Sequence, residues 1–367
     1  MPGALDGVTV LDFSRVLAGP YATMMLADLG ATVVKVERAG VGDETRAWGP
    51  PYDATGTPTY FTSVNRNKSS IAVDLRDPAH VAALRERVRG ADVVIENFRA
   101  GTMDRLGLGY DAFRDLRPDL VYCSLTGFGR GAGAELPGFD LLVQAVGGLM
   151  SITGTHPGDP TKTGVAIVDV VTGLHASTGI LAALLHRYRT GEGQRVEVNL
   201  LSSLLSALVN QASGFVGAGV VPGILGNAHP SIAPYESFPT ADRPLVVAVG
   251  TDGQFRSFAR AIGRPGLAED DRFRTNTARV AHRRDLADIV GPILAAEPAD
   301  VWFDRMRAHD VPAGPINTVA EAFAFAESLG LDPVVDVAGS PQVANPITLS
   351  ATPVHYTAPP PTLGNAP

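Results

Sequence analysis

A single carboxylate, Asp169, stands in an otherwise apolar run from Val165 to Val171. Burial among apolar groups disfavours the charged form of a carboxylate, so a residue in such a place is usually held by structural partners or tuned for chemistry. The residues that follow, 174–189, have a helical pattern that ends with basic residues and a glycine. Two roles are therefore open for Asp169: the N-cap of this helix, or a catalytic group.

The composition describes a globular protein of 367 residues, with 45% hydrophobic and 19% charged residues, which is long enough for two domains. The single Cys123 cannot form an internal disulfide, and we find neither a secretory signal nor an apolar run approaching the ~20 residues of a membrane span, so we expect a cytoplasmic protein. The net charge of −8 argues against a nucleic-acid partner. A polyanionic ligand would need a local cluster of Arg and Lys.

The first 130 residues alternate β-branched runs with helical patterns, which predicts a parallel sheet covered by helices in a Rossmann-like α/β domain. Glu37 even stands where a ribose-binding acid would be. The turn at 12–20, however, has no G-x-G-x-x-G pattern, which argues against nicotinamide or flavin binding. We expect strands at 8–11, 32–36, 71–74, 93–95 and 120–124, and helices at 19–29, 79–88 and 110–116.

After Asp169 the pattern predicts a strand at 195–198 and one apolar helix at 200–217, followed by a Gly- and Pro-rich loop at 219–234. The chain then reads as a smaller α/β domain that ends in a connector at 312–317. Its expected elements are a strand at 245–249 and helices at 253–262, 280–295 and 299–309, with a further helix at 319–326 beyond the connector.

Several blocks of the sequence, in order and spacing, together resemble the family III CoA-transferases, a family that includes α-methylacyl-CoA racemases and carnitine CoA-transferases. The resemblance covers nearly the whole chain. Its blocks are 5–12, 17–20, 28–38, 42–46, 65–68, 96–99, 127–129, 138–140, the Asp169 run, 191–194, 226–230 and 312–315.

The resemblance implies that Asp169 is the catalytic aspartate and makes catalysis the preferred role, with capping as a possible second one. A carboxylate that attacks an acyl-CoA thioester gives a mixed anhydride and CoA thiolate, and the thiolate then converts the anhydride to an aspartyl-CoA thioester. A second carboxylic acid reverses the sequence and leaves with CoA. The exchange is close to thermoneutral, so we expect coenzyme A as part of the substrate and no metal or redox cofactor.

By the same resemblance, a loop of the small domain closes over the aspartate, and its counterparts here are Gly226, Asn227 and His229. For His229, binding of the acceptor carboxylate and a plain loop histidine with a water partner are both open. Two of the residues that the resemblance assigns to CoA binding have a second interpretation. Arg76 is alternatively an exposed arginine that pairs with Asp74 or Asp77, and Phe98 is alternatively a core residue. The residues expected to bind CoA are Val16, Ala18, Arg38, Arg76, Asn97, Phe98, Met103 and Arg105.

Two pocket positions bear on the reaction. Racemases of the family carry a histidine where this chain has Phe139, which cannot exchange a proton, so we prefer a transferase over a racemase. Formyl-CoA:oxalate enzymes carry a glutamine where this chain has Leu17. An apolar residue there removes a hydrogen-bond partner for oxalate, so we expect a larger dicarboxylate, a hydroxyacid or a branched acid as the acceptor.

The family fold implies a homodimer of two interlocked chains, each with a large domain built from both ends of the chain. We therefore expect a large CoA-binding domain at 1–200, a linker at 201–224, a small domain at 225–317 and a return segment at 318–367 that lacks the family's final helix. The alternatives to a CoA-transferase are a 2-methylacyl-CoA racemase and a CoA-binding protein without catalysis.

Overall fold

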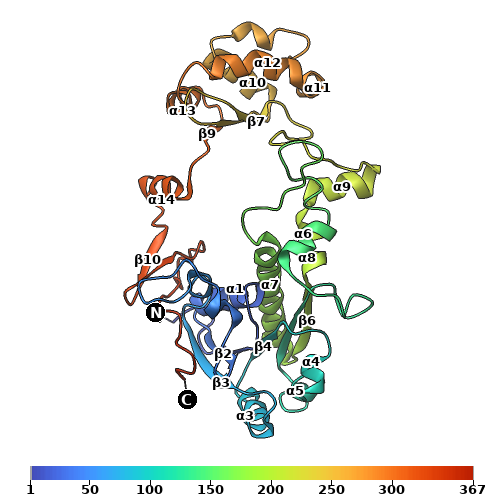
Figure 1. The fold of residues 1–367 in the computed structure, drawn as a ribbon, viewed down its shortest axis with the longest axis vertical. Helices are drawn as coiled ribbons and strands as arrows, with labels where there is room; N and C mark the ends of the chain where they lie inside the picture. The colour runs from blue at the N-terminus through green and yellow to red at the C-terminus, as the bar shows by residue number, and fades with distance from the viewer. Residues whose placement is uncertain (1, 367) are drawn as a thin grey trace. The chain divides into compact units, whose positions relative to one another are not determined.

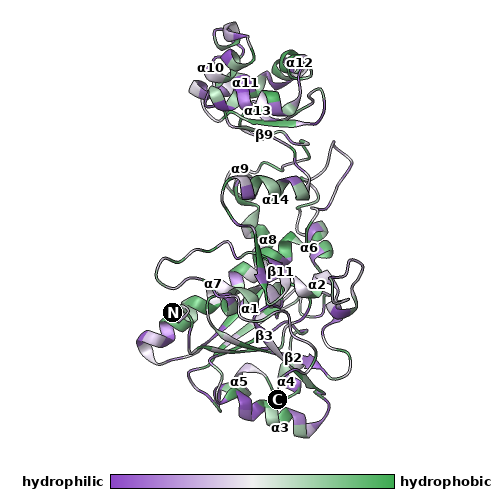
Figure 2. Ribbon diagram, turned by 90° about the vertical axis from the view of Figure 1, so that its left-hand side faces the viewer, coloured by the Kyte–Doolittle hydropathy of each residue, from purple (hydrophilic) through white to green (hydrophobic). Residues whose placement is uncertain are grey.

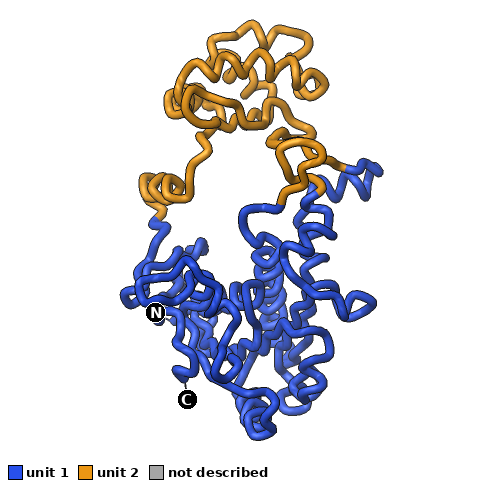
Figure 3. Tube along the Cα trace, in the orientation of Figure 1, with its two compact units in different colours: residues 1–150, 162–221, 332–367 blue, residues 151–161, 222–331 orange. Residues whose placement is uncertain are grey.

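The computed structural model describes residues 2–366 and divides into two compact units (Figure 3). The first unit comprises 1–150, 162–221 and 332–367, and the second comprises 151–161 and 222–331. This division differs from the expected one in three places. The segment 151–161 and the helix after the connector both belong to the second unit, and most of the expected linker is helical and lies in the first.

The first unit is built on a parallel sheet, which confirms the expected α/β class. Within the described residues this sheet has six strands in the order β3-β2-β1-β4-β5-β6, the order of Rossmann folds (Figure 1). Most apolar residues of β1 to β5 are buried on the two faces of the sheet, as is usual for parallel sheets, whereas those of the edge strand β6 are half-buried. The strands are β1 (Thr9–Asp12), β2 (Thr32–Arg38), β3 (Lys68–Val73), β4 (Val93–Glu96), β5 (Val121–Thr126) and β6 (Gln194–Asn199).

Helices cover both faces of this sheet. On one face α1 (Ala18–Asp28) and α7 (Ile167–Thr190) share a core with inward residues of the strands. A Cβ on Gly173 of α7 would lie 2.6 Å from the carbonyl oxygen of Ala18, so glycine is what lets these two helices approach each other. The helices of the other core are α3 (Pro78–Val88), α4 (Thr102–Arg105) and α5 (Tyr110–Arg114).

By length and composition α7 could cross a membrane, although here it packs on the sheet as a core helix. One expectation about the helices is wrong. The expected single helix at 200–217 is two helices, α8 (Leu200–Ala207) and α9 (Val209–Ala218), which meet at 84°. Val209 has a positive φ of 42° at the break, a backbone conformation that ends a helix. Figure 2 shows α7 and α8 among the hydrophobic segments.

Short elements complete the first unit. They are η1 (Glu44–Ala47), α2 (Thr59–Thr62), α6 (Asp140–Val146) and the hairpin of β10 (Val334–Val337) and β11 (Ser340–Val343). The segment after the hairpin has no helix or strand in its described residues, and its end bonds to the edge strand β3: Asn365 Oδ1 accepts from the backbone N–H of Ser70, and Ala366 N–H donates to Ser70 O.

The second unit has its own apolar core around Phe255, Phe258, Leu286 and Trp302. In its described residues the sheet is antiparallel, with three strands: β7 (Tyr235–Phe238), β8 (Leu245–Ala248) and β9 (Ala313–Pro315), the last in the expected connector. The expected helix at 280–295 is interrupted at His282. The helices are α10 (Asp252–Ala261), η2 (Pro265–Ala268), α11 (Asn276–Ala281), α12 (Arg283–Leu294), α13 (Ala299–Ala308) and α14 (Val319–Ser328).

Candidate active site

A cavity of ≈ 400 Å³ lies at the carboxyl edge of the parallel sheet and contains Asp169 in its wall. The loops after β1 and β4 contribute to it, and between these two strands the strand order changes direction. Ligands of open α/β sheets bind at such switch points. We call this the Asp169 cavity. Its wall includes 15–18, 97–100, 125–129 and 136–140, together with Glu44, Trp48, Asp169 and Leu200.

Asp169 lies in the first turn of α7, because this helix begins at Ile167, earlier than the sequence pattern indicated. The residue before the helix, Ala166, has no side chain able to cap it. The cap is instead the carboxylate of Asp140, whose Oδ2 accepts from the backbone N–H of Val168 at 2.8 Å and of Asp169 at 3.2 Å. The interpretation of Asp169 as the N-cap is therefore wrong.

Burial, and then the neighbouring charge of Asp140, raise the pKa of Asp169 to about 7. Within residues 2–366 the Asp169 carboxylate accepts no hydrogen bond. A carboxylate without such partners is not tied into the structure, and its oxygens remain open to a substrate. Asp169 thus combines the access and the shifted proton affinity that are typical of a carboxyl group in an active site.

Two aromatic residues missed by sequence reasoning lie near this carboxylate. The pKa of Tyr60 in α2 is raised by burial and then by the charges of Asp169 and Asp140, so its hydroxyl is within electrostatic range of both. Trp48 lines the Asp169 cavity and meets the Tyr60 ring edge to face, with 5.3 Å between the centroids. Trp48 therefore adds an aromatic ring to the wall of the cavity, and Tyr60 packs behind this ring.

The loop after β1 is fixed to the loop after β4 by Asn97. Its Oδ1 accepts from the backbone N–H of Arg15 at 2.9 Å, and its Nδ2 donates to Arg15 O at 2.7 Å. The Arg15 guanidinium lies over the ring of Phe98, 4.6 Å from its centroid, and its Nη1 is 2.6 Å from Glu44 Oε1. Both polar atoms of the Asn97 amide are thus bonded to the backbone of Arg15. The Arg15 guanidinium places a positive charge in the wall of the cavity.

Glu96 is the last residue of β4 and directly precedes Asn97 in the chain. Burial raises its pKa to about 7, although hydrogen bonds from Ser124 Oγ and from the backbone N–H of Phe98 oppose the shift. Among the described residues of the first unit, the pKa values of Glu96 and Asp169 are both raised to about 7, and of these two Asp169 lines the cavity.

Six of the residues expected around the substrate line the same cavity as Asp169. Phe98 is also partly buried against the core of the first unit, as its alternative interpretation expected, and its contact with CoA stays a prediction. Phe139 is 62% exposed and stands at the N-cap of α6. The six are Val16, Leu17, Ala18, Asn97, Phe98 and Phe139.

The other residues expected to bind CoA lie elsewhere. Arg76 and Arg105 line a second cavity of ≈ 370 Å³ together with Arg85, which we call the arginine cavity. Arg76 also forms the exposed pair with Asp74 that was one of its alternatives, at 2.9 Å. The Met103 side chain is buried in the core, and Arg38 is exposed at the end of β2; neither lines these two cavities.

The expected closing loop belongs to the second unit. Asn227 Nδ2 donates to Ser237 Oγ at 2.8 Å, and Gly226 has a positive φ of 60° that suits glycine. His229 Nδ1 accepts from the backbone N–H of Ser231 at 3.1 Å, and its ring packs on Tyr235. The His229 ring therefore has protein partners within its own unit, and neither of its alternatives is settled.

Sequence reasoning also missed Asp140 as a site residue. Its position directly after Phe139 and four residues before Gln144, which donates to its Oδ1, was the available signal. An acid and an amide at this spacing share one helix face, and Gln144 is fully buried.

Comparison with known proteins identifies the family. The model of CoA-transferase family III matches residues 5–366. The chain is 44% identical over 98% of its length to a succinate–glutarate CoA-transferase of Agrobacterium fabrum, of which the match covers 93%. It is 42% identical over 98% of its length to a mouse succinyl-CoA:glutarate CoA-transferase, of which 84% is covered.

Among solved structures, a CAIB/BAIF family protein from Brucella suis superposes with a TM-score of 0.89 at 40% identity. The match covers 99% of this chain and 97% of that one. With a family model that spans nearly all of the sequence, and relatives of the same class above 40% identity, the chain belongs to CoA-transferase family III and is a CoA-transferase.

Proposed function

We propose that the chain moves CoA from a dicarboxylic acyl-CoA to a second dicarboxylic acid through an aspartyl-CoA thioester on Asp169. The observation that carries this proposal is the Asp169 carboxylate itself: it lies in the wall of a cavity, has no hydrogen-bond partner in the described chain and has a raised pKa. A base of this kind is a stronger nucleophile than an ordinary surface carboxylate.

The reaction proceeds by two exchanges. An Asp169 oxygen attacks the thioester carbon, the C–S bond breaks, and CoA leaves as the thiolate. The thiolate attacks the Asp169 carbonyl carbon of the mixed anhydride, which releases the donor acid and leaves Asp169 as a CoA thioester. The acceptor carboxylate then repeats both steps in reverse order and departs as its own CoA thioester, which restores the Asp169 carboxylate.

The cavity suits these intermediates. An anhydride is lost if water reaches it, and Trp48, Phe98, Phe139 and Leu17 give much of the wall an apolar surface. Phe139 offers no second base for moving an α-proton, which disfavours racemisation. Transfer between thioesters needs no electron acceptor or Lewis acid, so we propose that the reaction uses neither a metal nor a redox cofactor.

The preference for dicarboxylates rests on the relatives, whose names state succinate and glutarate. Leu17 in the cavity wall agrees with an acceptor larger than oxalate. Arg15 and Glu44 add one charge of each sign to this wall, so the cavity is not closed to a charged acyl chain. We assign the arginine cavity to the phosphates of CoA, because Arg76, Arg85 and Arg105 supply fixed positive charge there.

We further infer a cytoplasmic homodimer, interlocked as in the family. Apolar surface left exposed by the single chain supports the association. Neither α9 nor α14 has a buried residue, and α7 exposes Leu174, Leu181, Leu185 and Tyr188 on one side.

Mass spectrometry tests the proposed route. The protein is incubated briefly with succinyl-CoA, glutaryl-CoA or acetyl-CoA, quenched and digested. We expect a CoA adduct on the peptide that contains Asp169, formed with the dicarboxylic donors and absent from Asp169→Ala. The control Asp111→Ala, which changes an exposed acid on α5, should form the adduct normally. Turnover by Asp169→Ala would overturn the proposal, and entry of solvent deuterium at the α-carbon would favour the racemase.

A further inference from the structure

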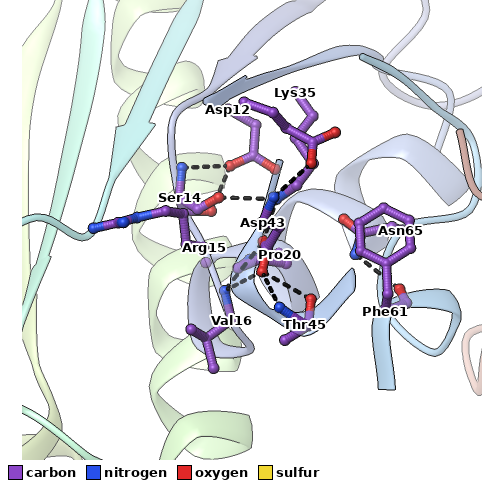
Figure 4. Close-up of polar contacts among 12 residues, drawn as sticks. Asp12, Ser14, Arg15, Val16, Pro20, Lys35, Asp43, Thr45, Phe61 and Asn65 are labelled. Carbon is purple, nitrogen blue, oxygen red and sulfur yellow. Dashed lines mark hydrogen bonds and ion pairs between the residues drawn. The ribbon is translucent and has the colours of Figure 1, made fainter. Parts of the chain in front are cut away.

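Beneath the Asp169 cavity lies a cluster of four buried charges, which Figure 4 shows in part. The side chains of Lys35, Asp43, Lys68 and Asp12 are all 0% exposed. Lys35 Nζ is 2.9 Å from Asp43 Oδ2, and Lys68 Nζ is 3.2 Å from Asp12 Oδ2. Buried ion pairs recover little net stability after desolvation, so their presence calls for another explanation.

Lys35 and Asp43 both hold the backbone of the loop after β1. Lys35 Nζ donates to Ser14 O at 2.9 Å, and the Asp43 carboxylate accepts from the backbone N–H of Val16, with 3.2 Å to Oδ2. Asp43 is itself fixed by Thr45, whose backbone N–H and hydroxyl both donate to Oδ1. The Lys35–Asp43 ion pair thus holds this loop by two backbone groups, the carbonyl of Ser14 and the N–H of Val16.

At the second of these two residues the backbone is strained. Val16 has a φ of +69°, in the left-handed region that β-branched residues strongly avoid. Such a conformation persists only where the surroundings impose it. Val16, Leu17 and Ala18 then form part of the Asp169 cavity wall, and Ala18 begins α1.

Lys35 and Asp43 both stay charged at neutral pH. Burial alone would lower the pKa of Lys35, but the charges of Asp12 and Asp43 hold it above its usual value. Burial would likewise raise the pKa of Asp43, but Lys35 and the hydrogen bonds from Thr45 keep it below its usual value. The ion pair is therefore a permanent feature of the loop.

We propose that Lys35 and Asp43 are positioning residues that hold Val16 in its left-handed conformation, so that the Val16–Ala18 wall of the cavity is formed before acyl-CoA binds. This inference rests on the proposed function, because it assigns the wall to the CoA thioester. Preorganisation of this kind lowers the ordering cost of binding, so its loss affects affinity more than the chemical step.

A double-mutant cycle of Asp43→Asn and Val16→Gly tests the proposal by calorimetric titration with CoA. We expect Asp43→Asn to weaken CoA binding at least tenfold, and to raise KM for acyl-CoA more than it lowers kcat. Glycine adopts positive φ without strain. In the Val16→Gly background, Asp43→Asn should therefore weaken binding less than threefold. A loss of the same size in both backgrounds would overturn the proposal.

Asp28→Asn is the matched control. Asp28 and Arg66 form another buried pair in the first unit, at 2.7 Å, without contact to the loop after β1. The variant should unfold at lower temperature, yet bind CoA within twofold of the wild type. Equal weakening by Asp28→Asn would show a general effect of stability and would also overturn the proposal.

Should Asp43→Asn fail to fold, Thr45→Val provides the same cycle without changing any charge. It removes the hydrogen bond from the Thr45 hydroxyl to Asp43, and we expect CoA to bind about threefold more weakly. In the Val16→Gly background this weakening should disappear. Unaltered CoA binding by Thr45→Val would contradict the proposal. Missing adducts on Asp169 in the wild type would refute the transfer route instead, since titration with CoA alone needs no turnover.

Discussion

Asp169 meets two opposing requirements. As a nucleophile it must be ionised, but the apolar wall that protects an anhydride from water also favours the neutral acid. The neighbouring Asp140 adds to the shift, and the resulting pKa of about 7 leaves a substantial share of the carboxylate ionised at neutral pH. The residue thus keeps a high proton affinity without losing its charge under physiological conditions.

The pH dependence of activity follows from this value. Only ionised Asp169 attacks, so kcat/KM should rise about tenfold per pH unit below pH 7 and level off above it, because this quantity reports ionisations of the free enzyme. Initial rates with a donor whose own ionisation lies well below pH 5 would measure the profile.

Glu96→Gln separates the two carboxyl groups that titrate near pH 7. If Asp169 governs the rate, kcat/KM of this variant still falls below about pH 7, whatever its maximal rate. We call this fall the acid limb of the profile. A limb that disappears in Glu96→Gln would assign the pH dependence to Glu96.

The same shift makes Asp169 costly for stability. Folding raises its pKa from 3.8 to about 7, so the folded state binds the proton more tightly and loses stability as the pH rises through this window. Asp169→Asn has no such penalty. We expect its unfolding temperature to exceed that of the wild type by about 2 °C or more at pH 8, and to match it near pH 4. Equal unfolding temperatures at pH 8 would contradict the raised pKa.

At the scale of elements, the first turn of α7 depends on a side chain from α6. Asp140→Ala removes the acceptor of two backbone N–H groups, which should cost about 1 kcal/mol of unfolding free energy. Asp140→Asn keeps an acceptor but removes the charge. We therefore expect little loss of stability in Asp140→Asn. Because the charge of Asp140 raises the pKa of Asp169, the acid limb of this variant should also lie at lower pH.

Denaturant unfolding and pH profiles of both variants measure these effects. An unchanged limb in Asp140→Asn would show that the charge of Asp140 does not act on Asp169.

The start of α7 shows why part of the structure could not be predicted from the sequence. The strands at the centre of the sheet follow from local β-branched runs, and their expected positions agree with the structure within a few residues. The residues before Asp169 form the same kind of apolar run, but here they begin a helix. What decides the outcome is Asp140, 28 positions earlier in the chain.

The candidate site was predictable to a similar degree. Leu17 and Asn97, in loops after strands, were expected from the resemblance to the family, and both line the Asp169 cavity. Residues that act through long-range contacts were missed: Tyr60 and Trp48 come from segments without a clear pattern. The buried partners Lys35 and Asp43 were missed as well, since a charged residue in a sequence is normally expected at the surface.

At the scale of the whole molecule, exposed apolar residues on α9 provide a test of the homodimer. Val216 is 83% exposed in the single chain. Phe215→Asp with Val216→Asp should convert a wild-type dimer to monomers in light scattering coupled to size-exclusion chromatography, because charges would be buried in the interface. Glu86→Lys on α3 is the control and should remain dimeric. A monomeric wild type would refute the inferred dimer.

The hydrogen bonds that join Asn365 and Ala366, near the end of the chain, to Ser70 of β3 have a consequence for synthesis of the protein. Asn365 and Ser70 lie 295 positions apart, so the edge of the sheet stays without this partner until almost the whole chain has left the ribosome. Contacts this distant in sequence form slowly, and an open strand edge can pair with other chains. Removal of this short segment should therefore increase aggregation during expression.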